Sequence, residues 1–188
     1  MTQTSSNANI VVIGAGVVGC SLAFHLARAG ARVRVFDKGG ICAGMSARSG
    51  ALVRMHYTFA PEAELAWKSL HYFRHWNEIV GGQCGFIETG FAVVVAQPNA
   101  ERLRANVAML RRLGVDTEVV TPAELRKLEP HTFVDDAALA AIEPRSGYAD
   151  PIATTESLAA AAKPHGAEFL TNAAIARIAT RGGRATGV

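Results

Sequence analysis

The sequence predicts an α/β fold that opens with a β-α-β unit and a parallel sheet. An apolar run over 10–13 leads directly into a glycine-rich turn, which is typical of a fully buried parallel strand. Apolar residues at helical spacing predict a helix over 17–29, and Gly30 ends it. Residues 32–36 alternate in polarity and predict a second strand. In this order the three elements form a right-handed unit with parallel strands.

The middle of the chain predicts helices and strands without continued β-α-β alternation. Residues 38–50 are rich in glycine, serine and alanine, so we expect a loop there. The further elements that we expect are a helix over 61–79, a strand over 86–95 with a break at 89–90, a helix over 99–113, a strand over 117–120, and a helix that starts at the capping sequence 121–124 and closes at Pro130.

The last part of the chain returns to strands around one helix. Its patterns predict a strand over 137–142, a turn at 147–151, a helix over 152–162, strands over 168–170 and 174–180, and a hairpin turn at 181–184.

Composition and charge exclude several classes of protein. Of the 188 residues, 49% are hydrophobic, which is enough for a packed core. The net charge of +3 comes from scattered Lys and Arg, so we expect no nucleic-acid partner. No stretch reaches the roughly 18 apolar residues of a membrane span. The three cysteines form no C-x-x-C pair, which argues against a disulfide framework and a metal site and favours the cytoplasm.

The glycine-rich turn has the pattern G-x-G-x-x-G. The first glycine makes a tight turn, the second lets the backbone approach a pyrophosphate, and the third lets the helix pack on the strand. The free N–H groups at the helix N-terminus attract the phosphates. The turn predicts a Rossmann-like dinucleotide-binding site, the alternative being an ordinary tight turn; its residues are Gly14, Ala15, Gly16, Val17, Val18 and Gly19.

Asp37 supplies a second part of the same signal. It ends the second strand, 18 positions after Gly19, where an acid binds ribose hydroxyls. A carboxylate there disfavours a 2′-phosphate, so we do not expect NADP. The cradle recognises only the ADP half, which FAD and NAD share. An NAD-dependent dehydrogenase would continue β-α-β alternation after Asp37, and the loop and long helix found instead favour FAD.

The chain resembles a known family over residues 10–188. The string 10–37 looks like the N-terminal signature of FAD-dependent amine oxidoreductases. The loop 46–57, Ser-Ala-Arg-Ser-Gly-Ala-Leu-Val-Arg-Met-His-Tyr, and the turn 147–151, Gly-Tyr-Ala-Asp-Pro, are similar to the sarcosine oxidase and glycine oxidase group of the D-amino-acid-oxidase-like superfamily. The resemblance implies a GR2-type FAD-binding domain, part of an α+β substrate domain, and FAD as cofactor.

The resemblance implies FAD contacts in three segments. The glycine turn and the ribose acid bind the ADP half, and the loop that follows contacts the pyrophosphate and flavin. An apolar residue on a later strand contacts the adenine region through its backbone; Ile175 matches it, the alternative being a plain core residue. The implied contacts are Gly14, Ala15, Gly16, Val17, Val18, Gly19, Asp37, Lys38, Ser46, Arg48, Ser49, Gly50, Ala51 and Ile175.

The resemblance also implies a substrate site around Arg54. In this group an arginine at that position holds the substrate carboxylate, and a guanidinium matches a carboxylate bidentately. His56 and Tyr57 lie beside it and line the same site. The alternatives are an arginine in a structural ion pair and a structural histidine. The implied reaction oxidises the C–N bond of a small amino acid or N-methyl amino acid, with no residue assigned as catalytic base.

The predicted organisation is that of a truncated enzyme. We expect a disordered leader at 1–9, an incomplete FAD-binding domain at 10–83 and 145–188, and part of a substrate-binding domain at 84–144. Members of this group are longer than this chain, so it is a fragment, a truncated gene product or one piece of a split enzyme, and alone it is inactive. A second hypothesis is a non-catalytic dinucleotide-binding module whose partner chain supplies the missing half.

Overall fold

The computed structural model describes residues 9–188 and divides the chain into two compact units. The first unit extends to Gly50 and also contains Trp76–Gly85 and Asp150–Val188, and the second contains Ala51–His75 and Phe86–Ala149. Residues 51–75, which the sequence-based division assigned to the FAD-binding domain, therefore make their contacts in the second unit. The expected leader lies outside the described residues, except for Asn9, which starts the first strand.

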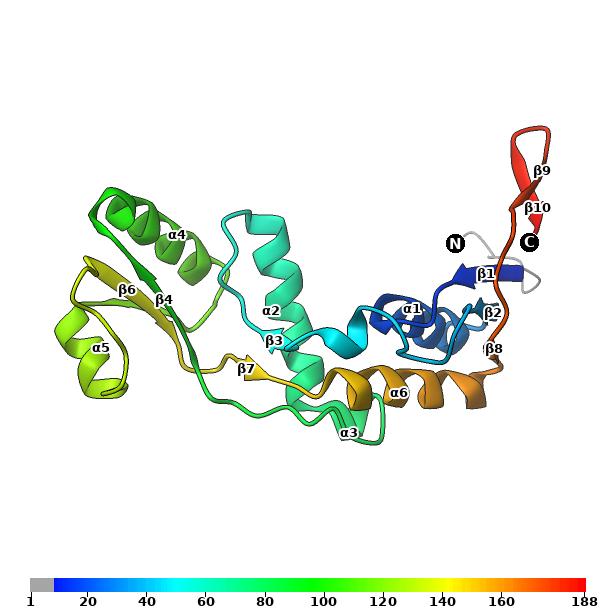
Figure 1. Ribbon diagram of the computed structural model, residues 1–188, viewed down its shortest axis with the longest axis horizontal. Coiled ribbons are helices and arrows are strands. Elements are labelled where there is room, and N and C mark those ends of the chain that lie inside the picture. The colour runs from blue at the N-terminus through cyan, green and yellow to red at the C-terminus, as the bar shows by residue number, and fades with distance from the viewer. Residues whose placement is uncertain (1–8) are drawn as a thin grey trace. The chain divides into compact units, whose positions relative to one another are not determined.

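The first unit contains the expected β-α-β start (Figure 1). Its three-stranded sheet has the order β1-β2-β8, and both neighbouring pairs are parallel. A separate antiparallel hairpin joins β9 and β10. The elements are β1 (Asn9–Ile13), α1 (Val17–Arg28), β2 (Arg32–Phe36), the 3-10 helix η1 (Ser46–Arg48), α3 (Trp76–Ile79), α6 (Pro151–Ala162), the 3-10 helix η3 (Lys163–His165), β8 (Glu168–Leu170), β9 (Ala179–Arg181) and β10 (Arg184–Gly187).

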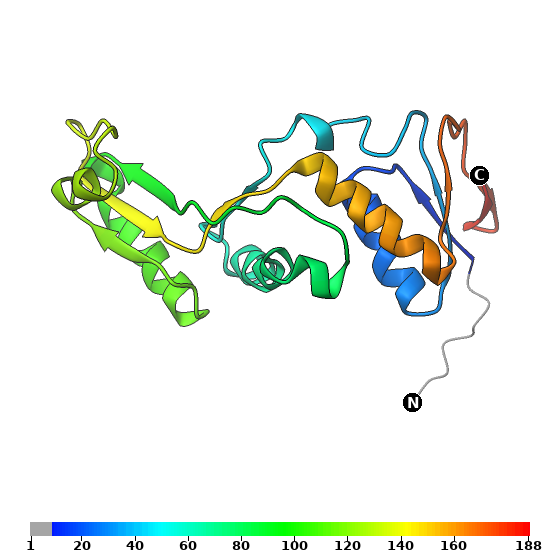
Figure 2. The same cartoon turned by 90° about the horizontal axis from the view of Figure 1, so that it is seen from below.

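Helices α1 and α6 lie side by side in the first unit, as Figures 1 and 2 both show. Small residues such as Ala23 and Ala159 are buried in the two helices and allow close packing. The prediction of a fully buried first strand is wrong. Val11 is 40% exposed and Ile13 is 53% exposed, whereas Val12 between them is buried, so among the described residues only one face of β1 is covered.

The second unit is built around an antiparallel sheet. Its strands have the order β4-β6-β5, and β3 pairs separately with β7 in an antiparallel ladder. The elements are β3 (Leu52–Val53), α2 (Ala60–Arg74), β4 (Phe91–Val95), the 3-10 helix η2 (Gln97–Asn99), α4 (Ala100–Arg112), β5 (Glu118–Val120), α5 (Pro122–Leu128), β6 (Leu139–Glu143) and β7 (Gly147–Tyr148).

The central strand β6 is covered on both faces. Leu139 and Ala141 pack against α4, whereas Ala140 faces a cluster that includes Leu125 of α5. A third cluster joins α2, α4 and the segment after β3 around Met55, which is fully buried. This core keeps the segment after β3 in a fixed place within the unit.

Most predicted elements are confirmed, and four differ. The predicted helix 61–79 is interrupted at His75, which leaves the helical conformation and separates α2 from α3. The predicted strand 174–180 forms only as β9, and residues 174–178 join no strand. Leu52–Val53 was expected in a loop and Gly147–Tyr148 in a turn, but their mutual pairing makes both short strands. The capping box at Thr121 and Glu124 is confirmed.

Candidate functional site

The glycine turn is packed so tightly that a side chain at its second or third glycine would clash with neighbouring atoms. Gly14 has a φ of +106°, a conformation that L side chains rarely adopt. A Cβ on Gly19 would lie 1.9 Å from the Gly14 carbonyl oxygen, and one on Gly16 would lie 2.9 Å from Ser46 Oγ. The first and third glycines thus fulfil the roles that the motif predicts, while the second makes room for a hydroxyl.

Asp37 is held by two backbone N–H groups. Its Oδ2 accepts a hydrogen bond from Ala15 N at 2.7 Å, and its Oδ1 accepts one from Gly39 N at 2.7 Å. These two bonds hold the pKa of the Asp37 carboxyl below its usual value, and the bond from Ala15 has the larger effect. The acid is therefore ionised at neutral pH and connects the glycine turn to the loop after β2.

A segment from the end of the chain forms the opposite wall of this site. The backbone N–H of Ala173 donates to the Asp37 carbonyl at 2.8 Å, and that of Asn172 donates to the Gly39 carbonyl at 2.9 Å. These bonds hold the residues just before the predicted strand 174–180 against the loop after β2. They place Ile175 beside the first unit's glycine turn and acid.

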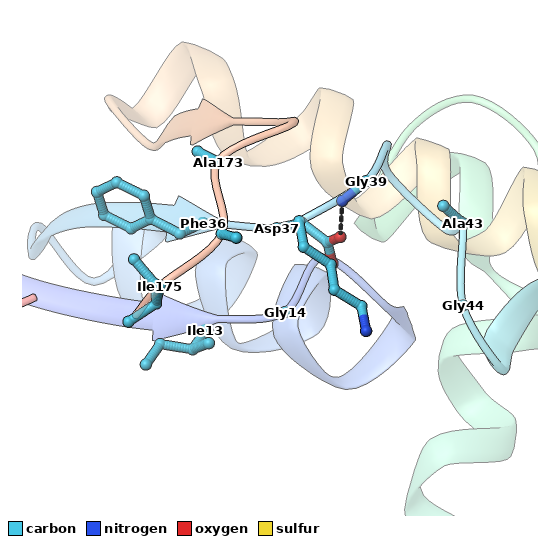
Figure 3. A pocket seen from close by; sticks show the side chains of 11 residues that line it. Ile13, Gly14, Phe36, Asp37, Gly39, Ala43, Gly44, Ala173 and Ile175 are labelled. Atoms are coloured by element: carbon cyan, nitrogen blue, oxygen red, sulfur yellow. Dashed lines mark hydrogen bonds between the residues drawn. The ribbon is translucent and has the colours of Figure 1, made fainter. Parts of the chain in front are cut away.

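These residues enclose an open pocket of about 620 Å³ within the first unit. Figure 3 shows Ile13 and Ile175 close together on one side of Asp37, with Ala43 and Gly44 on the other. The pocket thus has an apolar end beside a carboxylate and backbone, which suits a flat base next to a ribose. The lining residues are Ile13, Gly14, Phe36, Asp37, Lys38, Gly39, Ala43, Gly44, Ala173, Ala174 and Ile175.

The N-terminus of α1 meets the next part of the predicted cofactor site. Val17 N donates a hydrogen bond to Ser46 Oγ at 3.0 Å, so η1 lies against the helix end. Val18 is 71% exposed on the first turn of α1. Arg48, Ser49 and Gly50 are exposed and do not line the pocket, and Ala51 belongs to the second unit.

The residues present fit a dinucleotide in its ADP half. A glycine cradle, a helix of 12 residues whose first turn carries no acidic side chain, and an ionised acid after the second strand lie together in one unit. The sequence missed most of the pocket wall, including Phe36, Ala43 and Ala173. The small residues after Asp37 could have indicated that the loop 38–50 lines the pocket. Ala173 could not have been found in this way, because only hydrogen bonds between distant parts of the chain place it there.

The predicted substrate residues lie in the second unit, and Arg54 contacts both of the others. The Arg54 guanidinium carbon lies 4.7 Å from the centre of the Tyr57 ring and 5.4 Å from that of Phe91. Arg54 Nη1 donates to the His56 carbonyl. Among the described residues Arg54 therefore forms no ion pair with an acid, and its guanidinium lies over two aromatic rings instead.

The His56 ring points into a buried polar cluster that the sequence analysis missed. Its Nε2 lies 3.1 Å from the Asn106 amide, and its Nδ1 lies 3.7 Å from Oε1 of Glu143, whose side chain is only 1% exposed. Burial raises the pKa of Glu143, but the His56 ring, the Met55 N–H and the Ser146 hydroxyl outweigh it and lower the pKa overall. Nothing in the spacing of Glu143 signals this contact.

Other kinds of site are not seen in the described part of the chain. Residues 9–188 contain no group of three or more His, Cys, Asp or Glu side chains placed to hold a metal ion. Within the same residues, no helix has the length and apolar character needed to cross a membrane. Cys20, Cys42 and Cys84 form no disulfide within the described residues. Burial, with smaller effects of Cys42 and Asp37, raises the pKa of Cys20 to about 12.

Comparison with known proteins gives one family over almost the whole chain. The family model described as "FAD dependent oxidoreductase" (DAO) matches residues 9–188. Human sarcosine dehydrogenase, a mitochondrial protein, is 30% identical over 178 residues, which cover 92% of this chain and 19% of that protein. The mouse pyruvate dehydrogenase phosphatase regulatory subunit, also mitochondrial, is 23% identical over 185 residues, which cover 97% of this chain and 21% of that protein.

A solved structure agrees in both fold and sequence. L-proline dehydrogenase from P. horikoshii matches with a TM-score of 0.86 and 26% identity, over 94% of this chain and 47% of that one. The chain thus spans about a fifth of the length of the curated relatives and about half of the solved structure. The Rossmann-like α/β fold, the glycine cradle and the family match over residues 9–188 all indicate the same family. The chain therefore belongs to the family of FAD-dependent oxidoreductases.

Proposed function

We propose that this chain is the N-terminal, FAD-binding part of an oxidoreductase that oxidises the C–N bond of a small amino acid or N-methyl amino acid. The observation that carries the proposal is the pocket in which Asp37 and the glycine turn are joined by the Ala15 hydrogen bond. The names of two similar proteins, sarcosine dehydrogenase and L-proline dehydrogenase, favour an amine next to a carboxylate. FAD would supply the acceptor for the hydride equivalent.

The residues of the first unit would hold the ADP half of FAD. Backbone N–H groups at the start of α1 would face the pyrophosphate, and Asp37 would accept from the ribose hydroxyls. Ile175 and Lys38 line the pocket and would border the adenine end. For the loop residues Ser46, Arg48, Ser49, Gly50 and Ala51, pyrophosphate and flavin contact remains part of the proposal.

Arg54 would bind the substrate carboxylate. A guanidinium has N–H donors in a planar fork that fits a carboxylate. The described contacts of Arg54 are two aromatic rings and one carbonyl, so its charge is not already neutralised by an acid in the described residues. Tyr57 and His56 would support the same site, Tyr57 through its ring and His56 through its carbonyl.

A second candidate function is a non-catalytic module that needs a partner chain. One observation favours it: a relative of comparable coverage carries the name of a phosphatase regulatory subunit rather than of a dehydrogenase. In that case the pocket would bind a dinucleotide for structural or regulatory purposes. A cytoplasmic location remains our proposal for the chain, supported by three cysteines that form no disulfide among the described residues.

The test is to purify residues 1–188, add FAD, and record the flavin absorbance and the affinity. We expect weak but saturable binding of FAD, weaker binding of NADP, and no bleaching of the flavin when N-methylglycine is added to the chain alone. Asp37→Ala should abolish the FAD signal. Failure of FAD to bind would exclude the proposal, whereas bleaching by N-methylglycine would show that the chain alone is a complete enzyme.

The two candidates separate when the chain is mixed with a candidate second half. N-methylglycine should then reduce the bound flavin if the chain is part of an amine oxidoreductase. A complex that binds FAD tightly yet is reduced by no small amino acid would support the non-catalytic module. Size-exclusion chromatography shows in both cases whether a complex has formed.

A further inference from the structure

The guanidinium of Arg54 lies against two aromatic rings of the second unit. Tyr57 follows Arg54 closely in sequence, whereas Phe91 starts β4. The guanidinium carbon is 4.7 Å from one ring centre and 5.4 Å from the other, distances at which a cation is attracted to the face of a ring. Together with the Nη1 bond to the His56 carbonyl, these contacts restrict a side chain that is otherwise long and flexible.

The backbone beneath Arg54 is anchored by Glu143. Met55, the next residue, is fully buried, and its N–H donates to Glu143 Oε2 at 3.0 Å. The same oxygen accepts from Ser146 Oγ at 2.8 Å, while Oε1 faces the His56 ring. Moving the segment 54–57 would take two partners, the Met55 N–H and the His56 ring, from a buried carboxylate, which is costly. The backbone of Arg54 is therefore held in place as well as its guanidinium.

This arrangement leaves donors of Arg54 available. A guanidinium has five N–H donors in its plane, and in the described part of the chain the His56 carbonyl is the acceptor bonded to Arg54. Aromatic rings contact the faces of a guanidinium, whereas a carboxylate binds along its edge in the same plane. The contact with the Phe91 ring uses none of these N–H donors as a hydrogen bond to an oxygen, so donors remain for a carboxylate.

We propose that Phe91 is a positioning residue that holds the Arg54 guanidinium ready for a substrate carboxylate, on a segment that Glu143 anchors. The inference rests on the proposed function of Arg54, and it adds a residue that no sequence motif indicates. A pre-oriented side chain loses less conformational entropy when the ligand binds, so removing the ring should weaken carboxylate binding by about 5-fold.

The first experiment tests the positioning without any ligand. In the ¹⁵N-labelled chain 1–188, the Nε–H signal of Arg54, assigned by its loss in Arg54→Lys, should be shifted by the ring currents of its aromatic neighbours. Phe91→Leu should move this signal toward the position of a free arginine, and Phe91→Tyr should retain it. Phe86→Leu is the matched control, because Phe86 packs against the core cluster around Met55 and not against Arg54.

The second experiment titrates the same samples with N-methylglycine, and with N-methylethylamine as the probe that lacks a carboxylate. N-methylglycine should move the Arg54 signal, and N-methylethylamine should not. The affinity for N-methylglycine should be about 5-fold weaker in Phe91→Leu than in the wild type, and unchanged in Phe91→Tyr and Phe86→Leu. If Phe91→Leu does not move the Arg54 signal, the proposed positioning role of Phe91 is overturned. A signal that responds to Phe91→Leu but to neither probe overturns the proposed role of Arg54, and with it the purpose of the positioning.

Discussion

In the first unit, close contacts between atoms explain why particular residue types stand at particular positions. Gly19 is glycine because the carbonyl of Gly14 occupies the place of its Cβ, at 1.9 Å. Asp37 is an acid because two backbone N–H groups point at its two carboxylate oxygens. Such contacts link sequence to function directly, since the same atoms that fix the fold also shape the pocket.

Gly19→Ala should destabilise the chain strongly. The added methyl group has no space, so α1 must move away from the turn after β1, at a cost of about 2 kcal/mol. Urea unfolding monitored by circular dichroism measures the difference. Gly40→Ala is the control, because a Cβ on Gly40 meets nothing within 4 Å and its φ is not positive. Equal stability of the two variants would contradict the close approach.

Asp37→Asn should weaken FAD binding by roughly tenfold or more, since a hydrogen bond to a charged group contributes about 1.5–3 kcal/mol. An amide has a single acceptor oxygen, so one of the two backbone N–H groups, from Ala15 or Gly39, loses its partner. Fluorescence quenching of FAD measures the affinity. Asp136→Asn, at an exposed acid, is the control. A variant that binds FAD like the wild type would show that the carboxylate is dispensable.

At the scale of elements, the turn 147–151 shows how a family motif follows from geometry. Gly147 is required because the Ile87 carbonyl would lie 1.9 Å from its Cβ. Asp150 caps α6, with Oδ1 accepting from Ile152 N at 2.8 Å and Ala153 N at 2.9 Å, and Pro151 starts the helix. The motif is thus explained by folding alone.

Asp150→Ala should cost about 1 kcal/mol of unfolding free energy, because two N–H groups at the start of α6 lose their acceptor. Asp150→Asn should retain most of the stability, since both bonds go to a single oxygen that the amide keeps. Thermal unfolding of the three proteins in one buffer gives the comparison. If Asp150→Asn were as unstable as Asp150→Ala, charge rather than capping would explain the motif.

At the scale of the whole molecule, local signals were sufficient for some features and not for others. The glycine turn, Asp37 and the capping box at Thr121 each depend on residues near one another in sequence, and the sequence predicted them. The pairing of β3 with β7 and the contact of His56 with Glu143 join residues far apart, and no periodicity reports them. The exposed face of β1 was mispredicted because an apolar run does not reveal whether both faces of its strand are covered by other parts of the fold.

The buried cluster around Glu143 should make stability depend on pH. The pKa of Glu143 is lowered in the folded chain, so its ionised form stabilises the fold above the unfolded-state pKa of about 4.3, and this contribution is lost as the pH falls through the lower folded value. Urea unfolding of the wild type should therefore show decreasing stability below about pH 5.

Glu143→Gln should be less stable than the wild type at neutral pH, because a neutral amide cannot replace the charged acceptor between Met55 N, Ser146 Oγ and the His56 ring. The same variant has no carboxyl to protonate, so the gap between the two proteins should shrink as the pH falls. Glu101→Gln, at an acid whose side chain is 90% exposed, should follow the wild-type curve. Parallel curves for wild type and Glu143→Gln would mean that folding leaves the pKa of Glu143 unchanged, which would contradict its lowered pKa in the folded chain.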